Sequence, residues 1–226
     1  MSAVFITATG TDIGKTFVAA GLLRELRRRG RSVGALKPVV SGFDADRTTG
    51  SDPAVLLAAL GRDASAAEID RISPWRFAAP LSPDMAAHRE RRALDLAAVV
   101  EFSRRRIAES RCDALVIEGV GGVMAPIDDL GTVLDWMSAL ALPVVLVAGS
   151  YLGTISHTLS AIEVITARNL AIAAIVVNET PGSAVPLNDT VAVIGRFAAP
   201  IEVLALPLLA AGTAEHPAFS RLASLV

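Results

Sequence analysis

The sequence predicts one α/β domain over residues 1–226, with a parallel β-sheet that is flanked by helices on both faces. Three observations support this fold class. Strand-type and helix-type runs alternate along the chain, 52% of the 226 residues are hydrophobic, and only 4% are aromatic. A chain of this length suits a single core, and uninterrupted apolar strand runs are typical of parallel sheets covered on both sides. Ligands bind such sheets at the carboxyl ends of the strands, so motifs at strand ends should share one edge.

The N-terminal quarter contains the first strands and helices. Residues 3–8 (AVFITA) form a short β-type run, and residues 15–29 repeat apolar side chains at helical spacing before a glycine ends the pattern. Residues 33–40 (VGALKPVV) read as a second strand. A polar loop follows over residues 41–51, and we expect an aspartate to cap a helix over residues 52–60, with proline at its first position.

The rest of the chain continues the alternation. Residues 72–85 are rich in proline and predict irregular structure. A helix is expected over residues 93–110, where apolar residues recur on one side. Further strands are expected at 114–117, 144–148, 172–177 and 201–206, and further helices near 154–168 and 187–197.

Composition excludes several classes of function. The formal net charge is −2, so no basic surplus attracts a nucleic acid. The one cysteine, Cys112, cannot form an intramolecular disulfide or a multi-thiolate metal site. The longest apolar stretch, 140–148, is about half the ~20 residues that span a bilayer, and no signal peptide is read at the N-terminus. We therefore expect a cytoplasmic protein that contacts no membrane.

A phosphate-binding loop is predicted directly after the first strand. Thr9 is followed by Gly-Thr-Asp-Ile-Gly-Lys-Thr over residues 10–16, and the chain then enters a helix. This context favours a P-loop, in which backbone N–H groups surround phosphates, Lys15 contacts the β- and γ-phosphates and Thr16 ligates Mg²⁺. The usual pattern has glycine at the position of Thr9, and the glycines could instead only form a strand-to-helix turn. The fold class is thus P-loop NTPase-like.

Two acids are candidates for holding Mg²⁺ beside the phosphates. Glu118 ends a strand before the glycine-rich segment 119–122, where a Walker-B acid would lie. Asp52 is the second candidate, although it could serve only as a helix cap, and Asp44 and Asp46 are rivals in the preceding loop. Mg²⁺ prefers hard oxygen ligands and keeps several waters, so one or two carboxylates suffice.

Lys37 is a candidate catalytic cation. It lies in apolar surroundings at the predicted end of the second strand, next to Pro38. A lysine placed there must direct its ammonium group toward water or an anion, because an unpaired buried charge is costly. We expect Lys37→Ala to fold normally and lose turnover, and Lys15→Ala to weaken nucleotide binding as well.

Several segments together resemble the dethiobiotin synthetase family. The resemblance covers most of the chain up to Asn178, and the Lys-Pro-Val-x-Ser-Gly segment together with Leu-Gly-x-x-x-His is its most discriminating part. The matching segments, in chain order, are GTDIGKT (10–16), LKPVVSG (36–42), SD (51–52), APLSP (79–83), EGVGG (118–122) and LGTISHT (152–158).

The resemblance implies a reaction and a set of partners. Members of this family join CO₂ to 7,8-diaminononanoate and close a cyclic urea while ATP becomes ADP and phosphate. A carbamate of the diamine is phosphorylated, and the second amine then closes the ring. The implied partners are ATP, CO₂ or bicarbonate and the diamine, and the implied cofactor is Mg²⁺.

The resemblance also assigns site residues by position. Thr16, Asp52 and Glu118 match the metal group, while Thr11, Lys15, Lys37 and Ser41 match the group around carbamate and phosphate. Gly119 and Gly121 belong to the substrate segment. The ATP contacts are expected at Asp12, Ile13, Gly14, Lys15, Thr16, Asn178 and Pro207. Leu152, Gly153 and Thr154 match the loop that receives the substrate carboxylate from the partner subunit, which implies a homodimer with active sites at the interface.

Two other classes remain as alternatives. A ParA/MinD-like partitioning ATPase would use ATP as a dimer switch, but such proteins carry an additional lysine at the position of Gly10. An amidoligase acting on corrinoid precursors would need a glutamine-hydrolysing domain with a nucleophilic cysteine, and Cys112 lacks that context. Both are less consistent with the motifs than the ring-closing ligase.

Overall fold

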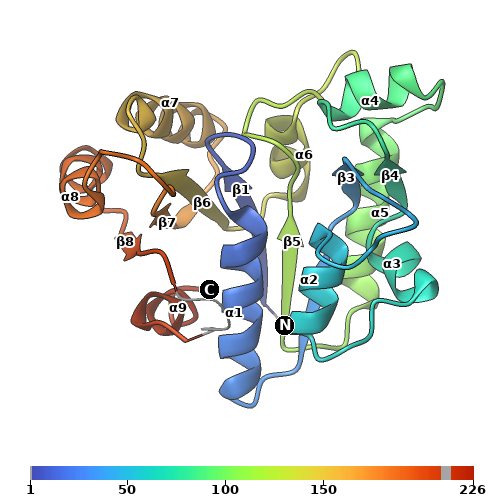
Figure 1. Ribbon diagram of the computed structural model, residues 1–226, viewed down its shortest axis with the longest axis horizontal. Coiled ribbons are helices and arrows are strands. Elements are labelled where there is room, and N and C mark those ends of the chain that lie inside the picture. The colour runs from blue at the N-terminus through green and yellow to red at the C-terminus, as the bar shows by residue number, and fades with distance from the viewer. Residues whose placement is uncertain (1, 210–214) are drawn as a thin grey trace.

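A computed structural model describes residues 2–209 and 215–226 of the chain. Within them, six strands form one parallel sheet in the order β2-β5-β1-β6-β7-β8 (Figure 1). Its strands are β1 (Ser2–Ala8), β2 (Val33–Leu36), β5 (Ala114–Glu118), β6 (Val144–Gly149), β7 (Ile172–Asn178) and β8 (Val203–Leu206). The predicted fold class is confirmed.

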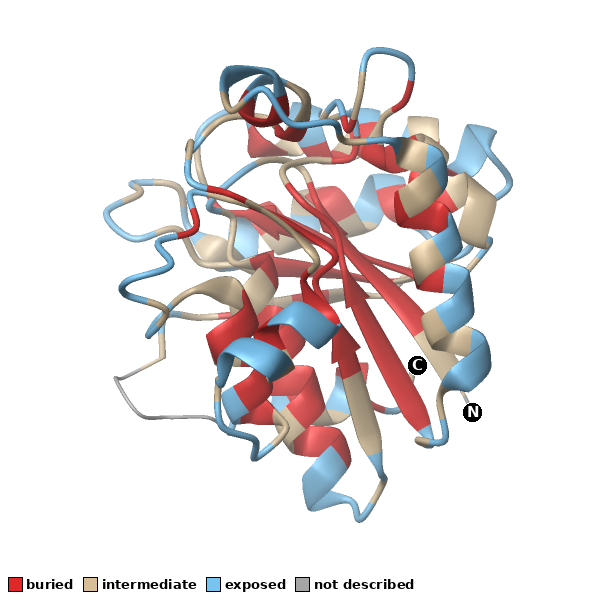
Figure 2. Ribbon diagram, turned by 90° about the vertical axis from the view of Figure 1, so that its right-hand side faces the viewer, coloured by how far each residue is buried: buried red, intermediate tan, exposed pale blue. Residues whose placement is uncertain are grey.

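Helices cover both faces of this sheet, and the central strands β5 and β6 between them are buried along their whole length (Figure 2). One face packs against α1 (Lys15–Arg28), α2 (Asp52–Ala59) and α9 (Pro217–Leu222). The other packs against α5 (Leu96–Glu109), α6 (Val133–Leu140), α7 (Thr154–Ala167) and α8 (Leu187–Ala198). Uniformly apolar strands such as VVLVA therefore follow from burial on two sides. None of the described helices has the length and apolar character to cross a membrane.

The strand expected at 33–40 is two strands, which corrects the sequence prediction. β2 ends at Leu36, and β3 (Val39–Ser41) pairs in parallel with β4 (Trp75–Phe77) in a separate small sheet. Proline has no N–H to donate to a ladder, and Pro38 lies between the two strands. Its carbonyl accepts from the Trp75 N–H at 3.1 Å, while the Lys37 N–H donates to the Ile72 carbonyl at 3.0 Å. The chain thus leaves the main sheet at Lys37.

The segment 72–85, expected to be irregular, is also partly regular. It contains β4 and the start of α4 (Pro83–Arg89), and it follows α3 (Ala66–Ile72). Proline stands in the first turn of α4, where its missing N–H is not needed. Short helices such as α3, α4, α6 and α9 offer too few turns for a clear apolar period, although α6 carries a capping box between Thr132 and Asp135.

Helix starts also differ slightly from the sequence prediction. Asp52 is the first residue of α2 rather than its cap, because Ser51 occupies the N-cap position in extended conformation. The Asp52 side chain therefore does not cap α2 and instead accepts a hydrogen bond from the Thr16 hydroxyl.

Close packing of α1 against α9 leads to a stability prediction. An ideal Cβ on Gly21 would lie 2.2 Å from the Phe219 ring, so the two helices touch through a residue with no side chain. We expect Gly21→Ala to lower the free energy of unfolding by about 1–3 kcal/mol, as overpacking typically does. Urea unfolding measures this change. Gly195→Ala is the control, since Gly195 also lies inside a helix without positive φ and its Cβ position meets only Val203 Cγ2 at 4.0 Å; an equal loss there would contradict the packing explanation.

A second stability prediction concerns Glu25 on α1, which is buried between α1 and α9. Its carboxylate accepts hydrogen bonds from Arg28, Arg29 and the Ser220 hydroxyl at 2.7–3.0 Å. These bonds, those from Arg28 above all, lower the pKa of Glu25 from 4.5 to about 2. Because the folded-state pKa is depressed, this stabilisation is present above pH 4.5 and is lost as the pH falls toward 2. Unfolding midpoints measured across that range should fall less steeply for Glu25→Gln than for the unmodified protein.

Candidate active site

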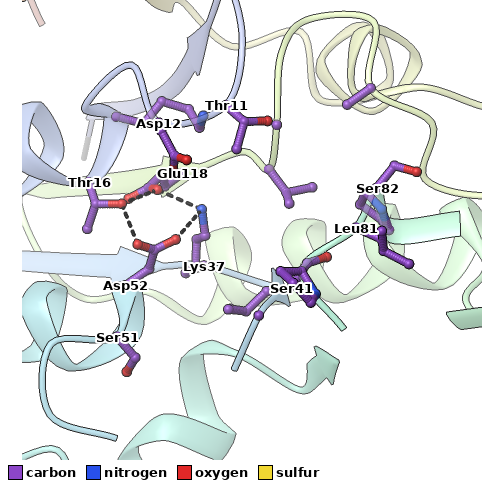
Figure 3. A pocket seen from close by; sticks show the side chains of 18 of the residues that line it. Thr11, Asp12, Thr16, Lys37, Ser41, Ser51, Asp52, Leu81, Ser82 and Glu118 are labelled. Atoms are coloured by element: carbon purple, nitrogen blue, oxygen red, sulfur yellow. Dashed lines mark hydrogen bonds and ion pairs between the residues drawn. The ribbon is translucent and has the colours of Figure 1, made fainter. Parts of the chain in front are cut away.

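A cavity of about 740 Å³ opens at the carboxyl edge of the main sheet (Figure 3). The phosphate loop after β1, the end of β2 and the end of β5 meet there, as expected for a parallel sheet. The lining residues are Thr11, Asp12, Gly14, Lys15, Thr16, Lys37, Val40, Ser41, Gly42, Gly50, Ser51, Asp52, Pro80, Leu81, Ser82, Pro83, Glu118, Val120, Gly121 and Ala125.

The loop between β1 and α1 has the conformation of an anion-binding turn. Gly14 caps α1 in the left-handed region at φ 97°, and Asp12 also has positive φ at 57°. The N-terminus of α1 therefore directs free N–H groups into the cavity. The Lys15 ammonium donates to the Gly10 carbonyl at 3.1 Å, so it lies folded over the loop that would enclose a phosphate.

Asn178, at the end of β7, lies outside the cavity and stabilises this loop with a side-chain hydrogen bond. Its side-chain Nδ2 donates to the Ile13 carbonyl at 3.1 Å. A Cβ on Gly14 would lie only 2.4 Å from the same Nδ2, so glycine is required there by space as well as by φ. The predicted nucleotide residues Ile13, Gly14 and Asn178 are thus brought together.

Lys37 and two carboxylates form a charge cluster under the loop, in which Lys37 and Glu118 are buried while the Asp52 side chain is 42% exposed. The Lys37 ammonium lies 2.6 Å from Glu118 Oε1 and 3.1 Å from Asp52 Oδ2 (Figure 3). It also donates to the Gly119 carbonyl at 2.7 Å. Lys37 is 2% exposed and Glu118 1% exposed. An ammonium has three N–H donors, and here all three have acceptors. In this state Lys37 has no donor left for another anion.

The same carboxylates meet the Thr16 hydroxyl. Its oxygen lies 2.9 Å from Asp52 Oδ1 and 2.7 Å from Glu118 Oε1. One hydroxyl proton can satisfy only one of these acceptors, and Glu118 Oε2 is buried without any partner among the described residues. Hard oxygen atoms with unused lone pairs at the mouth of a phosphate loop suit Mg²⁺, which needs few protein ligands. The three residues therefore fit such an ion.

The pKa values of the two lysines depend on burial and on the charges around them. Burial, and after it the neighbouring positive charge of Lys37, lower the pKa of Lys15 from 10.5 to about 8, although the nearby carboxylates act to raise it. For Lys37 burial also acts to lower the pKa, but Glu118 and Asp52 outweigh it and the net pKa is raised. Burial would raise the pKa of Asp52, yet Lys37 and the Thr16 hydroxyl outweigh that effect and lower it. Both lysines line one cavity, and the charge of Lys37 makes protonation of Lys15 less favourable.

The remaining predicted residues on this side of the molecule surround the cluster. Thr11 and Gly121 line the cavity, and Gly121 has positive φ at 60°. Ser41, at the end of β3, also lines it, and its buried hydroxyl has no partner among the described residues. Gly119 supplies the carbonyl that receives Lys37.

Four predicted residues lie apart from this cavity. Leu152 is 91% exposed in the turn before α7, Gly153 caps that helix at φ 98°, and the buried Thr154 hydroxyl donates to the Gly149 carbonyl at 2.8 Å. Pro207 follows β8, on the far side of Asn178 from the cluster. None of these residues lines the cavity of its own chain. Part of the segment after Pro207, residues 210–214, lies outside the described residues.

Several lining residues had not been assigned to the site from the sequence. Pro80, Leu81, Ser82 and Pro83 line the cavity where the chain passes from β4 to α4. Leu81 and Ser82 lie across the cavity from Thr11 and Asp12 of the phosphate loop (Figure 3). The proline-rich pattern at 79–83 was available as a signal. Val120 and Ala125 come from the loop after β5. No sequence motif indicates that Val120 and Ala125 belong to the site, and only the folded structure shows that they line the cavity.

Known proteins resemble this chain over most of its length. The AAA domain family matches residues 2–211. The chain is 45% identical over 208 residues to the ATP-dependent dethiobiotin synthetase BioD of Phenylobacterium zucineum (strain HLK1), covering 92% of this chain and 89% of that protein. It is 52% identical over 180 residues to the protein of the same name from Caulobacter sp. (strain K31), covering 80% and 77%.

Solved structures resemble the chain in fold alone. A ParA family ATPase from Chlorobium tepidum TLS superimposes with a TM-score of 0.52 at 16% identity, covering 100% of this chain and 92% of that one. Chloroplast FtsY from Physcomitrella patens gives a TM-score of 0.50 at 18% identity, with 89% of this chain and 56% of that one covered.

Proposed function

The chain belongs to the dethiobiotin synthetase family, and from this premise we propose that it is an ATP-dependent cyclo-ligase that closes 7,8-diaminononanoate with CO₂ into the cyclic urea dethiobiotin. The observation that carries the proposal is the pair of lysines, Lys15 and Lys37, in one cavity with Asp52 and Glu118 beside a phosphate loop. The enzyme would release ADP and phosphate.

The chemistry of this reaction fits the charges of the site. The amine first forms a carbamate with CO₂, the carbamate oxygen attacks the γ-phosphorus of ATP, and ADP leaves. The second amine then attacks the carbonyl carbon and phosphate departs. Each step develops negative charge on oxygen, which fixed cations in a buried site stabilise. Lys15 would contact the phosphates, and Lys37 with Thr11 and Ser41 would contact the carbamate and transferred phosphoryl oxygens.

Mg²⁺ is part of the proposal. Thr16, Asp52 and Glu118 would hold it, and it would supply positive charge that stabilises the developing charge on the phosphates. With Asp52 and Glu118 serving as metal ligands, Lys37 would have N–H groups available for substrate anions. The buried partnerless oxygen of Glu118 supports this assignment.

We also propose a homodimer in which each cavity is completed by the partner copy. Leu152, Gly153 and Thr154 do not line the cavity of their own chain, yet they stand at the N-terminus of a 14-residue helix. Free N–H groups at such a terminus suit a carboxylate, so a second copy would have to bring this turn to the substrate. The proposal includes one domain over residues 1–226, nucleotide contacts at Asn178 and Pro207, and a cytoplasmic location.

Mixing two inactive variants tests the shared site. Leu152→Glu places a negative charge beside the proposed carboxylate site, on an exposed residue. Lys37→Met inactivates the part of the site that the other copy contributes. If cavities are completed by the partner copy, a mixed dimer contains one intact site and activity returns on mixing. Failure of a verified mixed dimer to regain activity would contradict sites shared between copies.

Product analysis tests the reaction itself. The purified protein is incubated with 7,8-diaminononanoate, ¹³C-bicarbonate and Mg-ATP, and mass spectrometry follows the diamine. We expect a product that carries one labelled carbon as a cyclic urea, with one ADP formed for each ring. Slow ATP hydrolysis without any cyclised product would instead favour an ATP-switch function.

A further inference from the structure

A second cavity lies at the outer edge of the main sheet and shares no lining residue with the cavity that contains Lys37. Its volume is about 260 Å³. The edge strand β2 forms its inner wall, and the other walls come from the end of α2, from α3 and from the end of α5 with the segment before β5.

The lining of this cavity is rich in arginine. Arg62, Arg71, Arg106 and Arg111 line it, and Glu109 is the acidic residue among the described lining residues. The chain as a whole has a formal net charge of −2, so this group is a local concentration of positive charge. Such a concentration raises the local population of anions.

Side chains of the protein neutralise these arginines incompletely. Arg62 and Arg71 share one carboxylate, that of Glu68, at 3.1 and 3.3 Å. Arg106 reaches Glu109 at 3.7 Å, which is longer than a hydrogen bond. Arg111 has neither an ion pair nor a side-chain hydrogen bond within the parts of the chain that the structure describes. The wall therefore keeps guanidinium N–H groups without acceptors.

Arg106 gives the most specific indication of a missing ligand. Its side chain is 26% exposed, but its Nε is buried and has no hydrogen-bond partner among the described residues. Buried donors are nearly always satisfied, because losing hydration without gaining an acceptor is unfavourable. An oxyanion in the cavity would supply the acceptor that the protein does not.

We infer that this cavity is a second anion site, which binds a small phosphate-type dianion through Arg106 and Arg111 with support from Arg62 and Arg71. A planar guanidinium presents paired N–H groups that match two oxygens of a phosphate. The volume suits an anion of this size, since sites for drug-sized ligands span about 300–1,000 Å³. The inference does not depend on the proposed reaction.

The lining of this cavity also includes the backbone neighbours of Lys37, the proposed catalytic lysine. Leu36 and Ile72 both line it, Leu36 precedes Lys37, and the Lys37 N–H donates to the Ile72 carbonyl at 3.0 Å. An anion bound here would thus contact the backbone segments that hold Lys37 in place.

Calorimetric titration with inorganic phosphate tests the site, provided that the phosphate loop is treated separately. We expect two binding events in the unmodified protein. Lys15→Ala should remove or weaken the event at the phosphate loop, and the double variant Arg106→Gln/Arg111→Gln should weaken the other at least tenfold. Arg105→Gln, one residue away on the same helix and absent from the lining, should leave both unchanged.

A spectroscopic measurement covers the case in which the double variant folds poorly. In the Lys15→Ala background, the Arg106 Nε–H resonance should shift on addition of phosphate and saturate with it. A single binding event that disappears in Lys15→Ala, or an Arg106 resonance that does not respond to phosphate, would overturn the inference.

Discussion

Lys37→Met is expected to lower kcat by about 10²- to 10³-fold, the loss typical when one fixed charge or donor is removed from a developing oxyanion. Methionine keeps most of the side-chain volume and removes only the ammonium group. Steady-state turnover with saturating diamine and Mg-ATP measures the effect, with Arg105→Gln as a control for loss of a distant positive charge. Full activity in the methionine variant would contradict the assignment of Lys37 to the reacting carbamate and phosphoryl groups.

The structure changes what we expect of folding in this variant. From the sequence alone, loss of Lys37 was expected to leave folding normal. The ammonium is instead buried against Glu118 at 2.6 Å, so its removal leaves a buried carboxylate without a cation. Breaking a buried pair in this way costs about 3–5 kcal/mol of unfolding free energy. Urea unfolding should show this loss, and added Mg²⁺ should restore stability more in Lys37→Met than in the unmodified protein.

A second substitution separates the catalytic role from the structural one. Lys37→Met combined with Glu118→Gln removes both charges of the pair. We expect the double variant to regain most of the stability, because no buried charge remains unpaired, but no activity. Recovery of turnover in the double variant would mean that Lys37 serves only to neutralise Glu118.

Gly14→Ala is expected to weaken ATP binding on the order of 100-fold, from added left-handed strain of ~1–2 kcal/mol and overpacking of ~1–3 kcal/mol. Gly14 combines φ 97° with a Cβ position 2.4 Å from Asn178 Nδ2. A methyl group there would displace Asn178 or open the turn at the N-terminus of α1, where we propose that the phosphates bind. Equilibrium titration with ATP and Mg²⁺ measures the affinity.

Two further variants divide this effect into its causes. Gly30→Ala has a similar φ of 78° but an empty Cβ position, so it adds backbone strain without a clash and should leave ATP affinity intact. Asn178→Ala in the Gly14→Ala background frees the space. Because Asn178 is itself a proposed nucleotide contact, recovery is judged against Asn178→Ala alone: if the steric contact matters, Gly14→Ala should cost less affinity in that background than in the unmodified protein. No recovery would assign the loss to the backbone conformation alone.

The phosphate loop and the fold class could be read directly from the sequence. Both depend on short-range information: an apolar strand, a glycine-rich turn and Lys15-Thr16 at the start of a helix are contiguous, and each has its own local physical cause. Glu118 could also be predicted as a site residue, because an acid at the carboxyl end of a buried strand, followed by glycines, occupies the position of a Walker-B acid. Parallel topology then brings these segments to one edge.

The partners of Lys37 were decided by tertiary structure. Its position in the sequence showed a lysine among apolar residues, but the chain leaves the main sheet there, and Asp52 and Glu118 reach it from separate elements. The short strands β3 and β4 were missed for the same reason, since each is stabilised by pairing with a segment more than thirty residues away.

Local motifs thus sufficed to predict the type of site and the edge of the sheet on which its residues lie, because contiguous residues carry that information. The tertiary structure decided that Lys37 is held by two carboxylates, that Asn178 fastens the phosphate loop, and that the turn at Leu152 lies outside its own cavity. These are contacts between elements distant along the chain. They depend on packing and on compensation of buried charge, which no local pattern records.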